Sequence, residues 1–178
     1  INDGVIRAHY AEVFKAKDSV FATKRAVSVN MVQQDSLYIH GDTLMITGKP
    51  ESRILRAFRN AKFYKTDLSG KCDSIHFDEK TGVTQLITNP IMWNVENQIT
   101  GDSIHLLSDL ETEKLDSLKV LENAFIISLD TISKEGYNQA KGKDLFGKFI
   151  ENELKIIDLI KNTEVIYYVY DDKQELIG

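Results

Sequence analysis

The feature of this sequence that most constrains its fold is a short motif that recurs along the chain. The segment Asp73-Ser74-Ile75-His76 returns as Asp102-Ser103-Ile104-His105, 29 positions later. A glycine precedes each copy, at Gly70 and at Gly101. Two further segments begin with a glycine in a similar way, namely Gly41-Asp42-Thr43-Leu44 and Gly142-Lys143-Asp144-Leu145. A local unit repeated in this way indicates an array of similar structural steps.

A second recurring element begins with an asparagine. Its copies start at Asn60, Asn89, Asn123 and Asn162, and apolar or aromatic residues follow each of them. Each copy is interpreted as a strand that leads through a turn to a glycine-led strand. The repeat is therefore predicted to be one hairpin per step, with spacings of roughly 30 to 40 residues.

Alternation of apolar and polar residues favours strands over helices through most of the chain. Ile104 and Leu106 fall on one face of an extended segment, while Ser103 and His105 fall on the other. Residues 8–14 fit a short amphipathic helix as an alternative, but we interpret them, and residues 144–160, as strands. Stacked short antiparallel strands would place the apolar residues in a continuous ladder on one inner face.

Turn residues occur where such a meander needs them. We expect turns at Asp67-Leu68-Ser69-Gly70, at Glu79-Lys80-Thr81-Gly82 and at Asp171-Asp172-Lys173. The two prolines, Pro50 and Pro90, are expected at strand boundaries, where a missing backbone donor is tolerated.

Composition excludes several classes of protein. The 22 Lys and Arg residues and 27 Asp and Glu residues are interspersed, without the basic stripe of a nucleic-acid binder. No stretch approaches the roughly 20 apolar residues of a membrane-spanning helix. Cys72 is the only cysteine, so an internal disulfide and a cysteine-cluster metal site are both excluded.

Candidates for chemistry are weak. His40, His76 and His105 would form a metal site only if they converged, and alternation instead places His76 and His105 on a solvent-facing row. The repeated aspartates would be the first candidates for catalytic residues in an enzyme; they are Asp42, Asp73, Asp102 and Asp144. Catalysis needs one pair of carboxyl groups with different pKa values, whereas these residues occupy equivalent positions. We therefore interpret them as turn-stabilising residues. Ser74 and Ser103 lack a nucleophile elbow. We therefore expect no enzyme activity, no metal and no cofactor.

The ordered motifs resemble the OstA-like (LptA-type, organic solvent tolerance) family of lipopolysaccharide-transport proteins, in its Bacteroidetes-like version. The resemblance spans roughly residues 25 to 178 and is carried by residues 68–75, Asn89-Pro90-Ile91-Met92-Trp93, residues 99–104 and residues 137–143. It implies an all-β fold, an open, twisted, V-shaped β-jellyroll whose interior cradles acyl chains. It also implies a periplasmic, envelope-associated protein of outer-membrane biogenesis that stacks end to end with its relatives.

The lipid-binding candidates are the apolar residues expected on the inner face: Leu44, Ile46, Phe63, Ile75, Phe77, Trp93, Ile104, Leu106, Ile126, Leu145, Leu154 and Tyr167. For each residue the alternative is plain core packing, because alternation alone does not separate a filled core from an open groove. The assignment of faces is ambiguous after Lys119, where alternation slips by one residue at 118–121 and again at Ile156-Ile157.

The chain is expected to form one domain over residues 1–178, as a piece of a longer protein. The leading functional hypothesis is binding and transport of lipopolysaccharide or another acylated lipid. The alternative is a structural or protein-interaction scaffold with a fully packed core. The first strand near Val5 to Val13 and the aromatic end, Tyr167, Tyr168 and Tyr170, are predicted to pair with other envelope transport proteins or with a second copy through their edges.

Overall fold

The computed structural model describes residues 4–178 as a curled antiparallel sheet of 16 strands. A short 3-10 turn at Lys15–Lys17 interrupts the strands near the N-terminal end. The strands are β1 (Val5–Arg7), β2 (Tyr10–Phe14), β3 (Ser19–Val32), β4 (Asp35–Thr47), β5 (Ile54–Lys65), β6 (Leu68–Asp78), β7 (Val83–Ile87), β8 (Ile91–Asn94), β9 (Asn97–Thr100), β10 (Ser103–Ser108), β11 (Leu115–Leu121), β12 (Ala124–Leu129), β13 (Tyr137–Gly142), β14 (Asp144–Ile150), β15 (Glu153–Ile160) and β16 (Glu164–Ile166).

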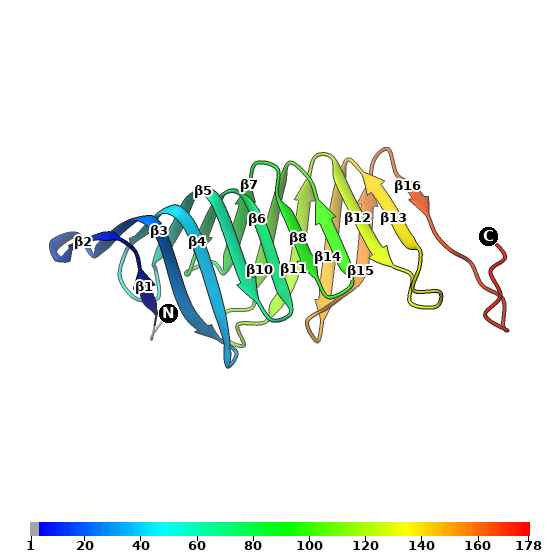
Figure 1. Cartoon of the computed structure of the whole chain (residues 1–178), viewed down its shortest axis with the longest axis horizontal. Coiled ribbons are helices and arrows are strands. Elements are labelled where there is room, and N and C mark those ends of the chain that lie inside the picture. The colour runs from blue at the N-terminus through cyan, green and yellow to red at the C-terminus, as the bar shows by residue number, and fades with distance from the viewer. Residues whose placement is uncertain (1–3) are drawn as a thin grey trace.

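The sheet divides into two leaves at β6. The first part of β6, Leu68 to Lys71, pairs with β8, whereas its second part, Ser74 to Asp78, pairs with β7. From there the short strands form two separate series, which we call leaf A (β7-β10-β11-β14-β15) and leaf B (β8-β9-β12-β13-β16). The long strands β3 to β6 run through both leaves. Figure 1 shows the strands lying side by side along the long axis, with β1 and β2 at one end and β16 at the other.

Corners between the leaves explain the asparagine-led repeat. A pair of residues with left-handed backbone lies at each of five corners: Lys24-Arg25, Arg59-Asn60, Thr88-Asn89, Glu122-Asn123 and Lys161-Asn162. At the corners within the long strands the ladder register shifts, as between Phe58 and Ala61 in β5. Asparagine tolerates a positive φ better than most residues, which is why it recurs there.

The glycine-led repeat lies on the neighbouring strands at the same corners. Asn60 Nδ2 donates to Asp42 Oδ2 at 3.2 Å, and Asn123 Nδ2 donates to Asp102 Oδ1 at 3.0 Å. A Cβ on Gly101 would lie 2.3 Å from Val120 Cγ1, so the corner there has no room for a side chain. The turn-stabilising role predicted for these two aspartates is confirmed.

Cys72, and not Gly70, occupies the corner of β6. The backbone N–H of Asp73 donates to Thr88 O across this corner, as that of Asp102 does to Glu122 O. The residue before each aspartate is therefore Cys72 in one strand and Gly101 in the other. Gly70 lies inside β6 under the Phe63 ring, 2.4 Å from where its Cβ would be.

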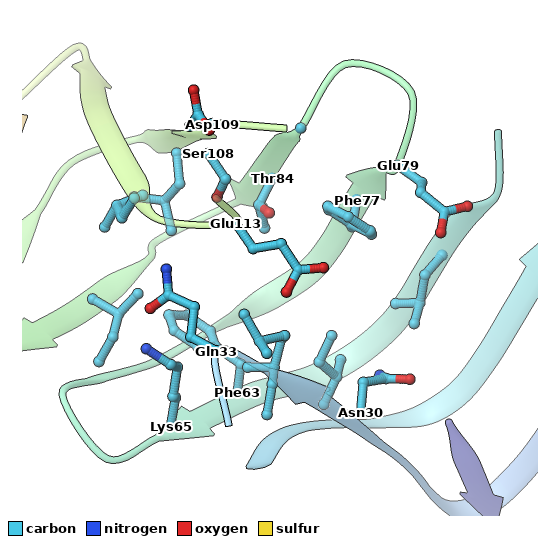
Figure 2. A pocket seen from close by; sticks show the side chains of 18 of the residues that line it. Asn30, Gln33, Phe63, Lys65, Phe77, Glu79, Thr84, Ser108, Asp109 and Glu113 are labelled. Carbon is cyan, nitrogen blue, oxygen red and sulfur yellow. The ribbon is translucent and has the colours of Figure 1, made fainter. Parts of the chain in front are cut away.

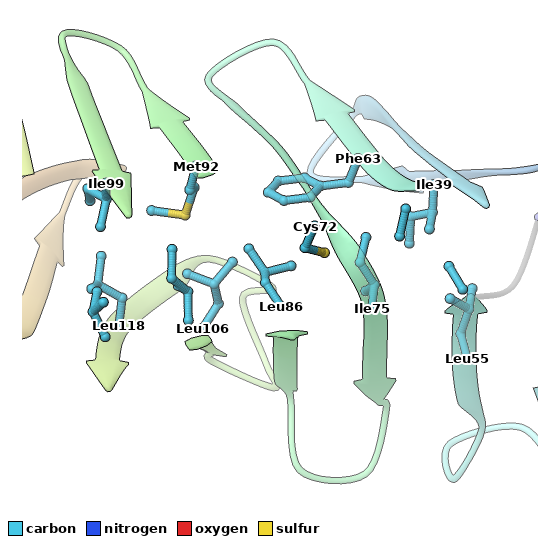
Figure 3. Close-up of a cluster of buried hydrophobic side chains, with 14 of the residues drawn as sticks. Ile39, Leu55, Phe63, Cys72, Ile75, Leu86, Met92, Ile99, Leu106 and Leu118 are labelled. Carbon is cyan, nitrogen blue, oxygen red and sulfur yellow. The ribbon is translucent and has the colours of Figure 1, made fainter. Parts of the chain in front are cut away.

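The apolar inner faces of the leaves meet in a core that runs along the corners. Ile39, Phe63, Met92 and Ile99 come from leaf B or its extension, and they face Leu55, Ile75, Leu86, Leu106 and Leu118 from leaf A or its extension (Figure 3). All of these side chains are buried. The alternation of apolar residues therefore specifies the inner face of both leaves.

Most of the expected elements are present. Residues 8–14 contain strand β2 rather than a helix, and residues 144–160 form β14 and β15. The turns at 79–82 and near 172 are confirmed, but the turn expected at 67–70 lies at Thr66 and Asp67, because β6 already begins at Leu68. No helix among residues 4–178 is long and apolar enough to cross a membrane.

Candidate functional site

A cavity of about 530 Å³ lies between the leaves, on the side away from the corners. Its walls are mainly apolar and include Leu37, Ile39, Leu55, Leu68 and Leu115. Figure 2 shows Phe63 approaching the cavity from leaf B's extension, with Phe77 and Thr84 on the opposite side. The interior is thus packed along the corners and hollow toward the free edges.

The free edges, which we call the lips, are formed by the turns opposite the corners. Two hydrogen bonds join the lips across the opening: Gln33 Nε2 donates to Thr112 O at 3.2 Å, and Asn94 Nδ2 donates to Asn152 O at 3.4 Å. Residues 33 and 94 belong to the leaf B side, while 112 and 152 belong to turns of leaf A. These contacts between the lips are polar, in contrast to the continuous apolar core at the corners.

The mouth of the cavity carries more acidic than basic side chains. The acidic residues are Glu51, Asp67, Glu79, Asp109 and Glu113, and the basic ones are Lys65 and Lys80. Lys65 Nζ lies 3.0 Å from Asp67 Oδ1, and its side chain is mostly buried. Asp109 accepts hydrogen bonds from Thr112, which lower the pKa of this carboxyl group below its usual value. The Asp109 carboxylate therefore remains charged at neutral pH.

A second hollow of about 470 Å³ continues the first toward the N-terminal end. Asn30 and Pro50 line both hollows. The second one extends past Ile6 and Val20 to the region of β1 and β2. The space between the leaves is therefore a groove along the molecule rather than one closed pocket.

The structure separates the predicted inner-face residues into groups. Phe63, Ile75, Phe77 and Leu106 line the larger cavity, and Ile46 lines the second one. The residues that are buried in the core but do not line either hollow are Leu44, Ile104, Ile126 and Leu145. Leu154 is partly buried against the core from the edge strand β15.

Trp93 does not lie on the inner face. Its side chain is 37% exposed, whereas that of the preceding Met92 is fully buried. Trp93 Nε1 donates to Gln98 Oε1 at 2.9 Å, and Lys71 Nζ lies 5.9 Å from the ring centroid, so the indole packs among outer-face neighbours. The prediction that Trp93 faces inward is wrong.

The structure also shows where Tyr167 lies and which faces the strands after Lys119 present to the core. Tyr167 follows the end of β16 and is 65% exposed, so it lies outside any strand ladder. Leu118 and Val120 are both buried, which shows that alternation does not slip there. It does slip in β15, where the ladder with β14 is irregular between Lys148 and Phe149.

Several cavity residues were not predicted from the sequence. Ile39 and Leu55 are inward-facing strand residues that alternation with Leu37 and Ala57 would have found. Asn30 and Asn94 are polar residues at inward-facing positions, and an apolar pattern gives no signal for them.

Histidine, cysteine and carboxylate side chains do not converge in the part of the chain that the structure describes. Among the described residues, no three His, Cys, Asp or Glu side chains lie together in a way that would hold a metal ion. His76 and His105 both pair with Gln85, so they lie on one outer row with a strand between them. Burial of His105 and the nearby Lys119 lower the pKa of this imidazole.

Two leaves joined at a row of corners and hollow between their lips define an open, V-shaped β-jellyroll with an apolar interior. The sequence profile of the LptA/(LptD N-terminal domain) LPS transport protein family matches residues 6–112. The chain belongs to this family, whose members are transport proteins and not enzymes.

A solved structure supports the same fold. The chain is similar to LptH of Pseudomonas aeruginosa, described as the LptA-homologous periplasmic component of the conserved lipopolysaccharide transport device. The TM-score is 0.54 with 12% sequence identity, over 64% of this chain and 80% of LptH. A comparison with curated proteins finds no match.

Proposed function

We propose that this chain is a periplasmic carrier in lipopolysaccharide transport, which holds acyl chains in the groove between its leaves. The observation that carries the proposal is the cavity of about 530 Å³ with its apolar walls, in a chain of the LptA family. Its volume lies within the range of sites that bind small ligands, roughly 300 to 1,000 Å³.

Burial of acyl chains supplies the driving force for such binding. Each methylene group removed from water contributes about 0.8 kcal/mol, and this contribution requires no exact geometry. Phe63, Phe77 and Leu106 provide the apolar surface. The same non-directional contacts allow an acyl chain to slide along the groove, because neighbouring positions offer similar surroundings.

Edge strands at the C-terminal end of both leaves support end-to-end assembly. β15 pairs with β14 alone and β16 pairs with β13 alone, so each has an unpaired edge. Ile156, Ile160 and Val165 are exposed near these edges. Edge strands of this kind add strands from another chain, so a second copy or another transport protein would extend the groove.

Native mass spectrometry with lipopolysaccharide tests the proposal. We expect wild-type protein to retain lipid and the Phe77→Asp variant to lose it, because a carboxylate in the cavity wall is poorly compatible with acyl chains. Trp93→Asp is the matched control, since Trp93 lies on the outer face and its replacement should leave lipid binding unchanged. Circular dichroism verifies that each variant is folded.

The alternative function is a protein-interaction scaffold. It is favoured by the core along the corners, where Leu44, Ile104 and Leu145 are fully packed by the chain itself. Folded wild-type protein that retains no lipid at any concentration tested would support this alternative and contradict the carrier.

A further inference from the structure

We infer that the outer face of leaf B and its extension is a docking surface for an acidic segment of a partner protein. This face lies on the opposite side of the sheet from the groove, so the inference goes beyond lipid transport and does not depend on it. The docking surface consists of an aromatic row, Tyr38, Tyr64 and Trp93, and a basic row beside it, Lys62 and Lys71.

The aromatic row follows from the register of four neighbouring strands, β4, β5, β6 and β8, which lie side by side in Figure 1. Tyr38 pairs with Tyr64, and the two ring centroids are 6.5 Å apart. Ser69 then pairs with Tyr64 on one side and with Trp93 on the other. Three strand spacings separate Tyr38 from Trp93, so the row is roughly 14 Å long.

All three rings of the aromatic row are exposed. Tyr64 is 58% exposed, Tyr38 is 43% exposed and Trp93 is 37% exposed. Their chain neighbours Ile39 and Phe63 belong to the core, so the rings project to the other side of the sheet. Tyrosine and tryptophan are enriched at the positions that dominate the binding energy of protein interfaces. A row of such rings on an uncovered sheet face is therefore typical of a recognition surface.

The basic row runs beside the aromatic row, two residues away from it on each strand. Lys62 pairs with Lys71, and both side chains are exposed. Lys71 Nζ lies 5.9 Å from the ring centroid of Trp93, which brings the two rows into contact. Neither lysine forms an ion pair with another described residue. Two positive charges on adjacent strands therefore have no partner within the described part of the chain.

The charge of this face is opposite to that of the whole chain, whose net charge is −5. In the described strands from β1 to β13, neither row contains an aspartate or a glutamate. The first acidic residue of the basic row is Glu164 in β16, and it is paired with Lys141 at 3.0 Å. Arg7 extends the basic row at the other end. Charge complementarity therefore favours an acidic partner.

Apolar residues within the rows favour a protein over other polyanions. Val29 and Ile127 extend the aromatic row, and Ile91 continues the basic row. Gln98, the polar neighbour of Trp93, already accepts the indole N–H at 2.9 Å, so few polar groups are left to bind sugar hydroxyls. A nucleic acid would require a longer basic stripe. A protein segment in which carboxylates alternate with apolar side chains matches both rows.

The size of the docking surface predicts weak, reversible binding. Two rows about 14 Å long and about 7 Å apart cover on the order of a few hundred Å². This is less than the roughly 800 Å² that each partner contributes to a standard interface. We therefore expect a transient complex whose affinity falls several-fold when salt screens the lysines.

Trp93 is the only tryptophan of the chain, so its fluorescence reports on this face. The probe is a synthetic peptide of about eight residues that alternates Glu with Leu and is long enough to cross the rows. We expect a saturable change in Trp93 fluorescence when the peptide is titrated into the full chain. Lys62→Glu and Lys71→Glu should each lower the affinity about tenfold. A peptide with Lys in place of Glu should bind the double variant more tightly than it binds wild type.

Lys119→Glu is the matched control. Lys119 Nζ lies 5.8 Å from the Phe146 ring on the outer face of leaf A, which reproduces the contact between Lys71 and Trp93 away from the docking surface. This variant should bind the acidic peptide as wild type does.

Three results would overturn the inference. They are no response of wild-type protein to the peptide, equal losses of affinity in Lys119→Glu and Lys71→Glu, and tighter binding of polygalacturonate or oligothymidylate than of the peptide. The last result would assign the face to a glycan or a nucleic acid instead. All three leave the carrier function standing, because the groove lies on the other side of the sheet.

Discussion

At the scale of single residues, the corners explain why two short motifs recur along the sequence. At the Asn60 and Asn123 corners, a left-handed residue pair on one strand meets a glycine and an aspartate on a neighbouring strand. The hydrogen bond from Asn123 to Asp102 at 3.0 Å shows how the two repeats fit together. The asparagine and glycine motifs are therefore one structural device.

The Asn123 corner gives a direct test of this device. Asn123→Ala should lower the free energy of unfolding by about 1–2 kcal/mol. Alanine is strained at φ 52°, and its side chain has no donor for the hydrogen bond to Asp102. Asn123→Gly should cost less, since glycine adopts this backbone without strain. Urea denaturation measures both variants. Equal losses in the two would show that backbone strain contributes nothing.

Cys72 provides a second test at this scale. Burial raises the pKa of its thiol to about 11, and its Sγ donates to Ser74 O at 3.1 Å. The thiolate is therefore scarce at pH 8, and reaction with a disulfide reagent should be slow in the folded protein and fast in urea. Rapid labelling under native conditions would contradict the placement of Cys72 at a packed corner.

At the scale of elements, the sequence predicted strands and repeats better than faces and turn positions. Alternation identified Ile104 and Leu106 correctly because their strand is six residues long. It failed at Trp93, because β8 has four residues and three consecutive apolar ones. The inward position there is fixed by the pairing of Met92 with Gly70 and Ile99, which local pattern does not reveal.

The candidate site was predictable only in part, for a physical reason. Apolar cavity residues such as Phe63 and Leu106 follow the same pattern as core residues such as Ile104. What distinguishes them is their distance from the corners, where the leaves diverge, and that depends on the curvature of the whole sheet. Asn30 and Asn94 break the apolar pattern, so an inward-facing polar residue was the missed signal.

The C-terminal segment after β16 gives a prediction for pH dependence. The hydroxyl of Ser133 and that of Tyr170 donate to Asp130, and these bonds lower the pKa of this carboxyl group to about 2. Because the folded pKa is lower than the usual 3.8, the stabilisation is fully present above pH 4 and is lost as the pH falls from 4 to 2.

Hydrogen exchange of residues 167–178 measures this release. Exchange should be independent of pH above 4, after correction for intrinsic rates, and should accelerate below it. Asp130→Asn should show fast exchange already at pH 7. Protection that is the same in both proteins at pH 7 would show that Asp130 does not hold the segment.

At the scale of the whole molecule, the open edges predict association. The apparent mass of wild-type protein in light scattering should rise with concentration. Ile157→Lys, on the inner side of the edge strand β15, should remain monomeric, because an inward-pointing charge blocks strand addition.

Leu107→Lys is the control for association. Leu107 is also exposed, but its strand, β10, is paired on both sides by β7 and β11. This variant should associate as wild type does. A wild-type protein that stays monomeric across the concentration series would contradict assembly through the edges.

Site-specific photocrosslinking determines whether acyl chains occupy the groove between the leaves. A benzophenone amino acid placed at Phe77 or Phe63 should crosslink to lipopolysaccharide, because both residues line the cavity. The same group at Trp93 or Tyr64 should not, because both side chains are exposed on the outer face of leaf B or its extension. Crosslinks from the outer positions with none from the cavity would show that the lipid binds outside the groove.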